Sequence, residues 1–211
     1  MILHQLRQMA IAVKLPLTIV GLGGIIATSV GIAAYLTASA SLEREARAHL
    51  NAALHGHKAA LESHLHSIEQ DLRIVASSVT TRWALMGFSE GWNEFEDHPT
   101  ESLHQLYITD NPHPMGQKDN LDAADDESTY SEVHALYHPW FRKVLRERGY
   151  YDVFLFDTAG NLVYTAFKEL DFATNFVSGE WRDTDLGKAF RAARDNPTEG
   201  FEAFFDFSEY G

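Results

Sequence analysis

Leu15–Leu36, with the sequence LPLTIVGLGGIIATSVGIAAYL, holds 22 residues without one formal charge. As an α-helix this stretch would extend about 33 Å, which matches the hydrocarbon core of a bilayer. Secretory signal peptides have shorter apolar cores of about 7–15 residues, although Ala38-Ser39-Ala40 resembles a cleavage site. We therefore predict an uncleaved transmembrane helix over residues 15–38.

The charges on either side of this segment predict its orientation. Arg7 and Lys14 precede it, whereas Glu43 and an acidic remainder follow it. Because basic residues that flank a span stay in the cytoplasm, residues 1–14 are predicted to form a cytoplasmic tail. Residues 39–211 are then predicted to form a domain on the opposite, periplasmic side of the membrane.

The composition narrows what this domain does. The formal net charge of the chain is −13, which argues against nucleic acid or anionic lipid as a partner of the soluble part. With no cysteine, the chain has no disulfide, no catalytic thiol and no cysteine-ligated metal. The sequence also lacks a serine nucleophile elbow, a phosphate-binding loop and recognisably spaced catalytic carboxylates, so we predict no enzyme activity and no cofactor.

Histidines are numerous and raise the question of a metal site. His134 and His138 lie four residues apart, a spacing that places both side chains on one face of a helix. No His-Glu motif accompanies them and Pro139 follows directly, so we predict that they bind no metal. A collective response of exposed histidines to pH is the alternative.

A stripe of apolar residues at helical spacing follows the transmembrane segment. Charged residues and histidines fill the other positions, so the pattern predicts one long amphipathic helix that continues the span. We expect the stripe to pack partly on its own domain and partly on a second copy of the chain, which predicts a homodimer. Gly23, Ala27 and Gly31 would let neighbouring spans approach closely. The stripe consists of Leu50, Leu54, Leu61, Leu65, Ile68, Leu72 and Val75.

Three further helices are predicted, over residues 80–91, 128–148 and 183–194. Pro139 is expected to kink or restart the second of these, and Gly149 to end it. Asp183 or Thr184 is expected to cap the third. The acidic stretch Asp119–Glu127 lacks the ligand pattern of a calcium loop and is predicted to be solvated surface.

The spacing of apolar residues changes to a period of two after the second of these helices. Tyr150–Phe156 and Leu162–Phe167 are predicted strands, and the short turn Asp157–Asn161 requires them to pair as an antiparallel hairpin. Phe201–Phe207 is apolar enough for a third strand. Long helices combined with antiparallel strands give the fold class α+β.

The hairpin region, YYDVFLFDTAGNLVYTAFKELDFATNF at residues 150–176, resembles the extracytoplasmic sensor domains of bacterial methyl-accepting chemotaxis receptors. These are PAS-like domains of the Cache type, in which a long helix packs behind a small antiparallel sheet. The stretches HPWFRKVLRERG and IEQDLRIVASSVTTRWAL extend the resemblance over residues 63–210. It implies a receptor of the bacterial inner membrane that signals the presence of a small extracellular ligand.

The same resemblance implies that the 211 residues are an N-terminal fragment. Such receptors continue through further strands, a second membrane helix and a cytoplasmic signalling region, so the PAS-like sheet is expected to be incomplete at its C-terminal end. Cytoplasmic signalling partners would then act only through the missing region. Two alternatives stay open: the same sensor on a histidine kinase or nucleotide cyclase, and a membrane-anchored interaction protein without a ligand.

Six residues of this region are candidate ligand contacts, because a pocket combines apolar walls with a few placed polar groups. Arg142 or Lys168 is expected to hold a ligand carboxylate, and Asp152 a ligand ammonium group. In the structural alternative Asp152 caps a turn, Arg142 pairs with a neighbouring carboxylate, and the aromatic residues lie in the core. The six candidates are Trp140, Arg142, Tyr151, Asp152, Tyr164 and Lys168.

Overall fold

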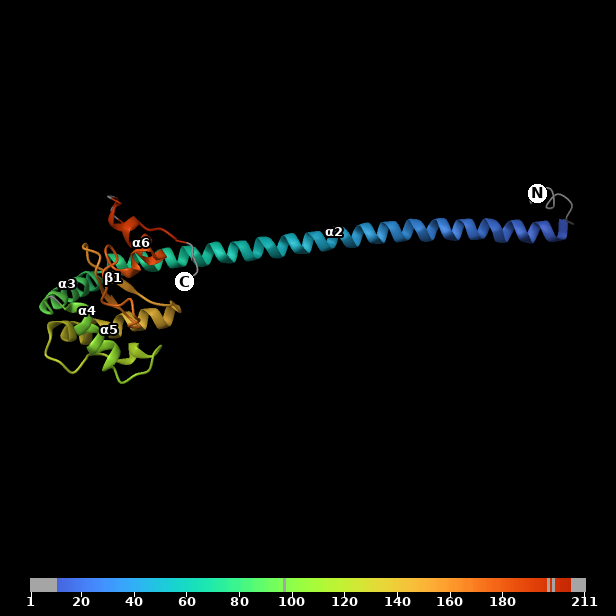
Figure 1. The fold of residues 1–211 in the computed structure, drawn as a ribbon. Coiled ribbons are helices and arrows are strands. Elements are labelled where there is room, and N and C mark those ends of the chain that lie inside the picture. Colours follow the sequence, from blue (N-terminus) through green and yellow to red (C-terminus); the bar gives the residue numbers. More distant parts are fainter. Residues whose placement is uncertain (1–10, 97, 197, 199, 206–211) are drawn as a thin grey trace. The chain divides into compact units, whose positions relative to one another are not determined.

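The computed structural model describes residues 11–96, 98–196, 198 and 200–205 (Figure 1). By its internal contacts the chain divides into two compact units, the first ending at His66 and the second beginning at Ser67. Helix α2 (Ile11–Ser77) runs without interruption from the first unit into the second. The sequence predicted this continuity, because no helix-breaking pattern separates the apolar segment from the leucine stripe.

The part of α2 in the first unit is long and apolar enough to cross a membrane, judged by length and composition, and none of the residues in its apolar window is buried. The leucine stripe that follows is also uncovered, with Leu54 66% exposed. Towards the end of the helix Val75 packs against the core of the second unit. Only the last part of the stripe is therefore covered by the described chain.

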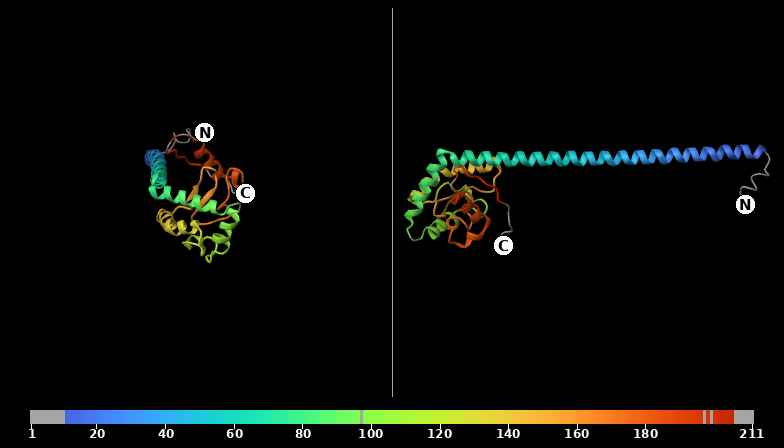
Figure 2. Two further views of the ribbon diagram at one scale, coloured as in Figure 1. Left: turned by 90° about the vertical axis from the view of Figure 1, so that its left-hand side faces the viewer. Right: turned by 90° about the horizontal axis from the view of Figure 1, so that it is seen from above.

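Helices α3 (Val79–Glu94) and α5 (Thr129–Arg148) lie side by side in the second unit (Figure 2). Each begins at a serine whose hydroxyl accepts a backbone N–H of the first turn, as N-caps do. Gly149, with φ of 71°, ends α5 as predicted. The helical assignment continues through Pro139, so of the predicted kink or restart the restart does not occur.

Shorter elements connect these two helices. Their bounds are α4 (Pro99–His104), the π-helical turn η1 (Gln105–Thr109) and the 3-10 turn η2 (Lys118–Asn120).

The predicted antiparallel hairpin is confirmed, with strands shorter than expected. Strands β1 (Phe154–Phe156) and β2 (Leu162–Thr165) pair with Leu155 opposite Tyr164, and a register shift separates Leu155 from Phe156. Gly160 closes the turn with φ of 93°, and a Cβ there would lie 2.5 Å from a methyl carbon of Val177. The turn therefore requires glycine at this position on two grounds.

An aromatic core joins α3 and α5 to β2. Phe88 and Tyr164 stack with ring centroids 4.7 Å apart, and Tyr130 packs on the same Phe88 ring. A smaller cluster on the other side of the hairpin includes Phe176 and Phe190. Both faces of β2 are consequently covered, and all four of its residues are buried.

The chain after the hairpin continues through the 3-10 turn η3 (Glu180–Asp183) and helix α6 (Asp185–Arg194). Thr184 caps α6, which selects one of the two predicted caps. The third strand predicted over Phe201–Phe207 was wrong for residues 201–205, which adopt no regular structure; residues 206–207 lie outside the described residues. Helices with a two-stranded antiparallel sheet make the described chain α+β in coarse terms.

Candidate functional site

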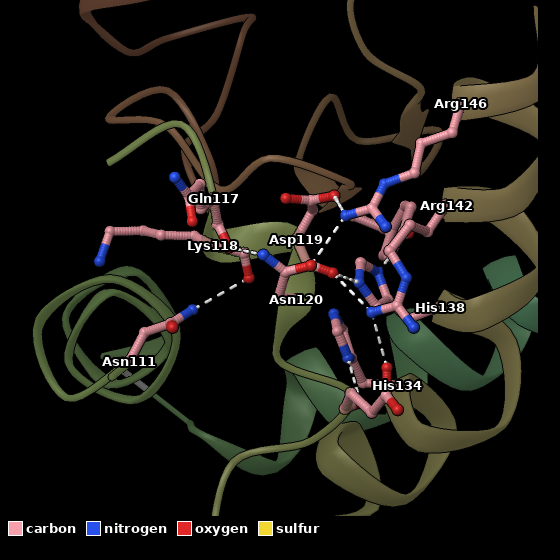
Figure 3. Close-up of polar contacts among 11 residues, drawn as sticks. Asn111, Gln117, Lys118, Asp119, Asn120, His134, His138, Arg142 and Arg146 are labelled. Carbon is pink, nitrogen blue, oxygen red and sulfur yellow. Dashed lines mark hydrogen bonds and ion pairs between the residues drawn. The ribbon is translucent and has the colours of Figure 1, made fainter. Parts of the chain in front are cut away.

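A polar network fixes η2 and the residues directly after it to the side of α5 (Figure 3). The carbonyl oxygen of Asp119 accepts hydrogen bonds from His138 Nε2 at 2.7 Å and from Arg142 Nη1 at 2.6 Å. The carboxylate of Asp119 pairs with Arg146. Because His138 donates through Nε2, its Nδ1 accepts the hydroxyl proton of Tyr164, 2.7 Å away.

His134 lies beside His138, with ring centroids 4.2 Å apart. Its Nδ1 donates to the carbonyl of Asp122 at 2.6 Å, and its Nε2 is buried without a hydrogen-bond partner in the described chain. Burial, together with the nearby charge of Lys168, lowers the pKa of both histidines, that of His138 to about 3. Both imidazoles are therefore neutral near pH 7, so these two are not the exposed, pH-responsive histidines of the alternative reading.

The prediction that Asp119–Glu127 is solvated was wrong at its first residue. Asp119 is only 3% exposed, because its backbone and its carboxylate both bind α5. The segment is held by contacts with side chains 19 to 27 residues further along the chain. A local composition rule does not detect such contacts.

The described residues hold no group of three histidine or acidic side chains that could bind a metal ion.

Lys168 lies at the centre of the aromatic core and is 1% exposed. Its Nζ donates to the carbonyl of Thr165 and lies 4.4 Å from the ring centroid of Tyr164 and 5.1 Å from that of Phe172. Burial lowers the pKa of Lys168 to about 7, against the opposing effect of Asp152. The aromatic rings replace water around the ammonium group through cation–π contacts.

Asp152 faces the same region from the start of the hairpin. Its carboxylate accepts the hydroxyl of Thr165 and the backbone N–H groups of Ala166 and Val153, the latter two at 2.8 Å and 2.6 Å. Burial raises its pKa despite these three donors. Asp152 therefore acts as a turn residue that fixes the end of β2 to the segment before β1.

The six residues predicted to contact a ligand lie at different places. Arg142 pairs with Asp122 at 2.7 Å, and Lys168 is enclosed, so the two expected carboxylate holders are both engaged inside the protein. Tyr164 bonds His138, and Trp140 is half-buried against Phe141 with ring centroids 4.9 Å apart. Of the six, Tyr151 alone lines the groove described next, and it is 72% exposed.

This groove lies beside β1 and has a volume of about 750 Å³. Apolar side chains form most of its wall, among them Phe154, Leu170 and Leu186. Glu169 and Asp171 contribute carboxylates from the loop after β2. The hydroxyl of Tyr151 donates to Glu169 at 2.9 Å, which holds this carboxylate at the margin of the groove.

Two polar atoms of the groove residues are buried without a partner in the described chain, Oδ1 of Asp171 and the indole Nε1 of Trp181. Burial, reinforced by the neighbouring charges of Asp152 and Glu169, raises the pKa of Asp171 to about 6. Buried polar atoms are nearly always hydrogen-bonded in folded proteins. The described chain therefore leaves one acceptor and one donor without a partner in residues that line the groove.

Sequence reasoning missed Glu169, Asp171 and Trp181. Two carboxylates flanking Leu170 directly after a strand were the available signal, but acidic residues are common in this chain and the pattern is unspecific. Trp181 is brought to the groove by η3, far from the hairpin in sequence.

Comparison with known proteins finds no matching family model, curated protein or solved structure.

Proposed function

We propose that this chain is the membrane-anchored sensor part of a bacterial transmembrane receptor, with a PAS-like domain of the Cache type in the periplasm. The observation that carries the proposal is the uninterrupted helix α2, which leads from an apolar, membrane-length segment into the packed second unit. The assignment to chemotaxis receptors, in preference to a histidine kinase or a cyclase, rests on the resemblance of residues 150–176 alone.

An ionic contact gives α2 a fixed attachment within the second unit. Asp71, which is 8% exposed, accepts the hydroxyl of Tyr150 at 2.6 Å and pairs with Arg148 at 2.9 Å. These two residues flank Gly149, where α5 ends and the hairpin begins. A rearrangement of α5 or of the hairpin would consequently pull on the last turns of α2.

Signalling would then be a shift between two arrangements of the second unit, one of which binds the ligand better. The contact at Asp71 would transmit that shift to α2, and α2 would carry it towards the membrane. A second copy of the chain is the proposed partner of the leucine stripe, because Leu50, Leu54 and Leu61 are exposed at helical spacing.

The test uses the full chain in lipid nanodiscs. Since the protein has no cysteine, each variant carries a single thiol for oxidative crosslinking. Leu54→Cys places it on the leucine stripe, and Ala52→Cys places it on the opposite face of the helix. We expect Leu54→Cys to crosslink far faster than Ala52→Cys. Among amino acids, small organic acids and amines, at least one compound should raise the Tm and change the crosslinking rate at position 54.

Asp71→Ala separates binding from transmission. The variant should keep the Tm increase caused by the compound but lose its effect on crosslinking at position 54. The proposal fails if no compound raises the Tm, or if the crosslinking response persists in Asp71→Ala. Near-UV circular dichroism confirms that the variant retains its tertiary packing.

A further inference from the structure

We infer that the groove beside β1 binds an organic monocation, a protonated amine on an apolar body, and discriminates against amino acids and carboxylic acids. The inference rests on the proposed receptor function only in treating the bound molecule as a signal. Its chemistry comes from the residues that line the groove, all of which belong to the second unit.

The size and walls of the groove suit a small organic molecule. Its volume of about 750 Å³ lies within the range of about 300–1,000 Å³ that is typical of ligand pockets. Phe154 comes from β1, Leu170 from the loop after β2, and Leu186 and Ala189 from α6. These side chains offer an apolar surface to the body of a ligand.

The charges of the groove have one sign. Glu169, Asp171 and Asp185 contribute carboxylates, and no lysine or arginine is among the described residues that line it. Asp185 pairs with Lys188 on the next turn of α6 at 2.9 Å. Glu169 receives only the neutral hydroxyl of Tyr151 among the contacts described above, so a cationic ligand would balance the remaining negative charge.

Hydrogen-bonding capacity agrees with this charge. An ammonium group donates protons and accepts none, which matches the carboxylates of Glu169 and Asp171 in the wall of the groove. A ligand carboxylate would have no proton to donate there and would add a like charge. The indole N–H of Trp181 is a neutral donor and does not compensate that repulsion.

The cations that could have held a ligand carboxylate are occupied elsewhere. Arg142 pairs with Asp122 and binds the carbonyl of Asp119. Lys168 is enclosed by aromatic rings and donates to Thr165. Neither residue lines the groove. An amino acid would therefore place its ammonium group well but leave its carboxylate opposite two acidic side chains.

Three probes that share a phenylethyl body and differ in charge test the inference: 2-phenylethylamine, phenylalanine and 3-phenylpropionate. Isothermal titration on the full chain in nanodiscs measures the Kd of each. We expect 2-phenylethylamine to bind, phenylalanine to bind at least about tenfold more weakly, and 3-phenylpropionate to show no binding. Tighter or equal binding of phenylalanine or 3-phenylpropionate, or no binding of the amine, overturns the inference.

Matched variants locate the site. Asp171→Asn and Glu169→Gln should each weaken amine binding about tenfold, because each removes one charge-assisted contact. Asp195→Asn, at the exposed end of α6 and outside the groove, should leave the Kd unchanged. Undiminished binding in both Asp171→Asn and Glu169→Gln would also overturn the inference.

The pH dependence gives a second readout. The pKa of Asp171 is raised to about 6 by burial and by Asp152 and Glu169, the acidic groups that act on it. Amine binding should therefore weaken as the pH falls from 7.5 to 5.5, and Asp171→Asn should flatten this dependence. Equal pH dependence in the parent protein and in Asp171→Asn would contradict the assigned contact.

The outcomes separate the two proposals. If 2-phenylethylamine binds the groove but leaves crosslinking at position 54 unchanged, the ligand class stands and the receptor mechanism fails. If the amine does not bind while another compound raises the Tm and alters crosslinking, the receptor mechanism stands and the ligand class is wrong.

Discussion

Buried polar side chains distinguish the second unit at the scale of single residues. Lys168 is enclosed by tyrosine and phenylalanine rings, and its backbone has φ of 59°, a region that residues other than glycine rarely adopt. His134 and His138 are fully buried beside it. Such an arrangement is stable only because carbonyl oxygens and ring faces replace the lost hydration.

The free energy of unfolding should depend on pH through Lys168. Its pKa is lowered from 10.5 to about 7 on folding, so between these values the unfolded chain binds more protons. Stability should therefore rise with pH from about 7 upward, by at most about 1.4 kcal/mol per pH unit. Denaturant unfolding of the full chain at pH 7, 8 and 9 measures the slope.

Lys168→Met should abolish this rise, because methionine fills similar space without a titrating group. Lys143→Met, which changes an exposed lysine on α5, should keep the slope of the parent protein. His134 and His138, whose pKa values are lowered on folding, add to the slope only near pH 7, where their unfolded imidazoles still bind protons, so the slope between pH 8 and pH 9 isolates Lys168. Identical slopes in Lys168→Met and the parent would show that the buried ammonium is not the cause.

Single-residue chemistry was the least predictable part of the site. The sequence identified Arg142, Asp152 and Lys168 as polar residues near a hairpin, and their structural alternatives describe the observed contacts of the first two. It did not identify Glu169 or Asp171, because their environment depends on α6 and η3 packing against the hairpin loop. Burial by distant segments determines which carboxylate oxygen lacks a hydrogen-bond partner, and the local sequence pattern does not predict that burial.

At the scale of elements, the close packing of α3 on α5 determines where the hairpin lies. Gly91 is the point of nearest approach, since a Cβ there would lie 2.6 Å from the backbone N and Cα of Tyr130. Tyr130 in turn donates its hydroxyl to the carbonyl of Val163 in β2 at 2.8 Å. A change at Gly91 would thus disturb both the helix pair and the sheet.

Gly91→Ala should lower the free energy of unfolding of the second unit by about 1–3 kcal/mol, the usual range for overpacking. Gly56→Ala is the matched control, because that glycine lies in α2 with nothing within 4 Å of its Cβ position. The control should be neutral or stabilise the helix by about 0.5–1 kcal/mol. Equal stability of Gly91→Ala and the parent in denaturant unfolding would rule out the close approach.

Periodicity and caps predicted elements better than they predicted irregular segments. Helix α5 could be bounded from the sequence because Ser128 and Gly149 are strong start and stop signals. The hairpin followed from its short turn. Residues 201–205 were misread as a strand because apolar, aromatic composition does not supply the partner strand that a ladder requires.

At the scale of the whole molecule, α2 is the element on which the account depends. Its apolar part is membrane-length, its middle carries exposed leucines, and its end is attached to α5 through Asp71. The sequence predicted this order because long helical periodicity is the most reliable local signal. The membrane itself and the side on which the second unit lies are proposals drawn from length and flanking charge.

Substituted-cysteine labelling tests that proposal most directly. Ile11→Cys lies before the apolar segment, and Asp195→Cys lies in the second unit. The chain has no other thiol. In bacterial spheroplasts an impermeant maleimide should label position 195 while the membrane is intact, and position 11 only after the membrane is disrupted. Labelling of position 11 from outside, protection of position 195, or recovery of the chain in the soluble fraction would contradict the account.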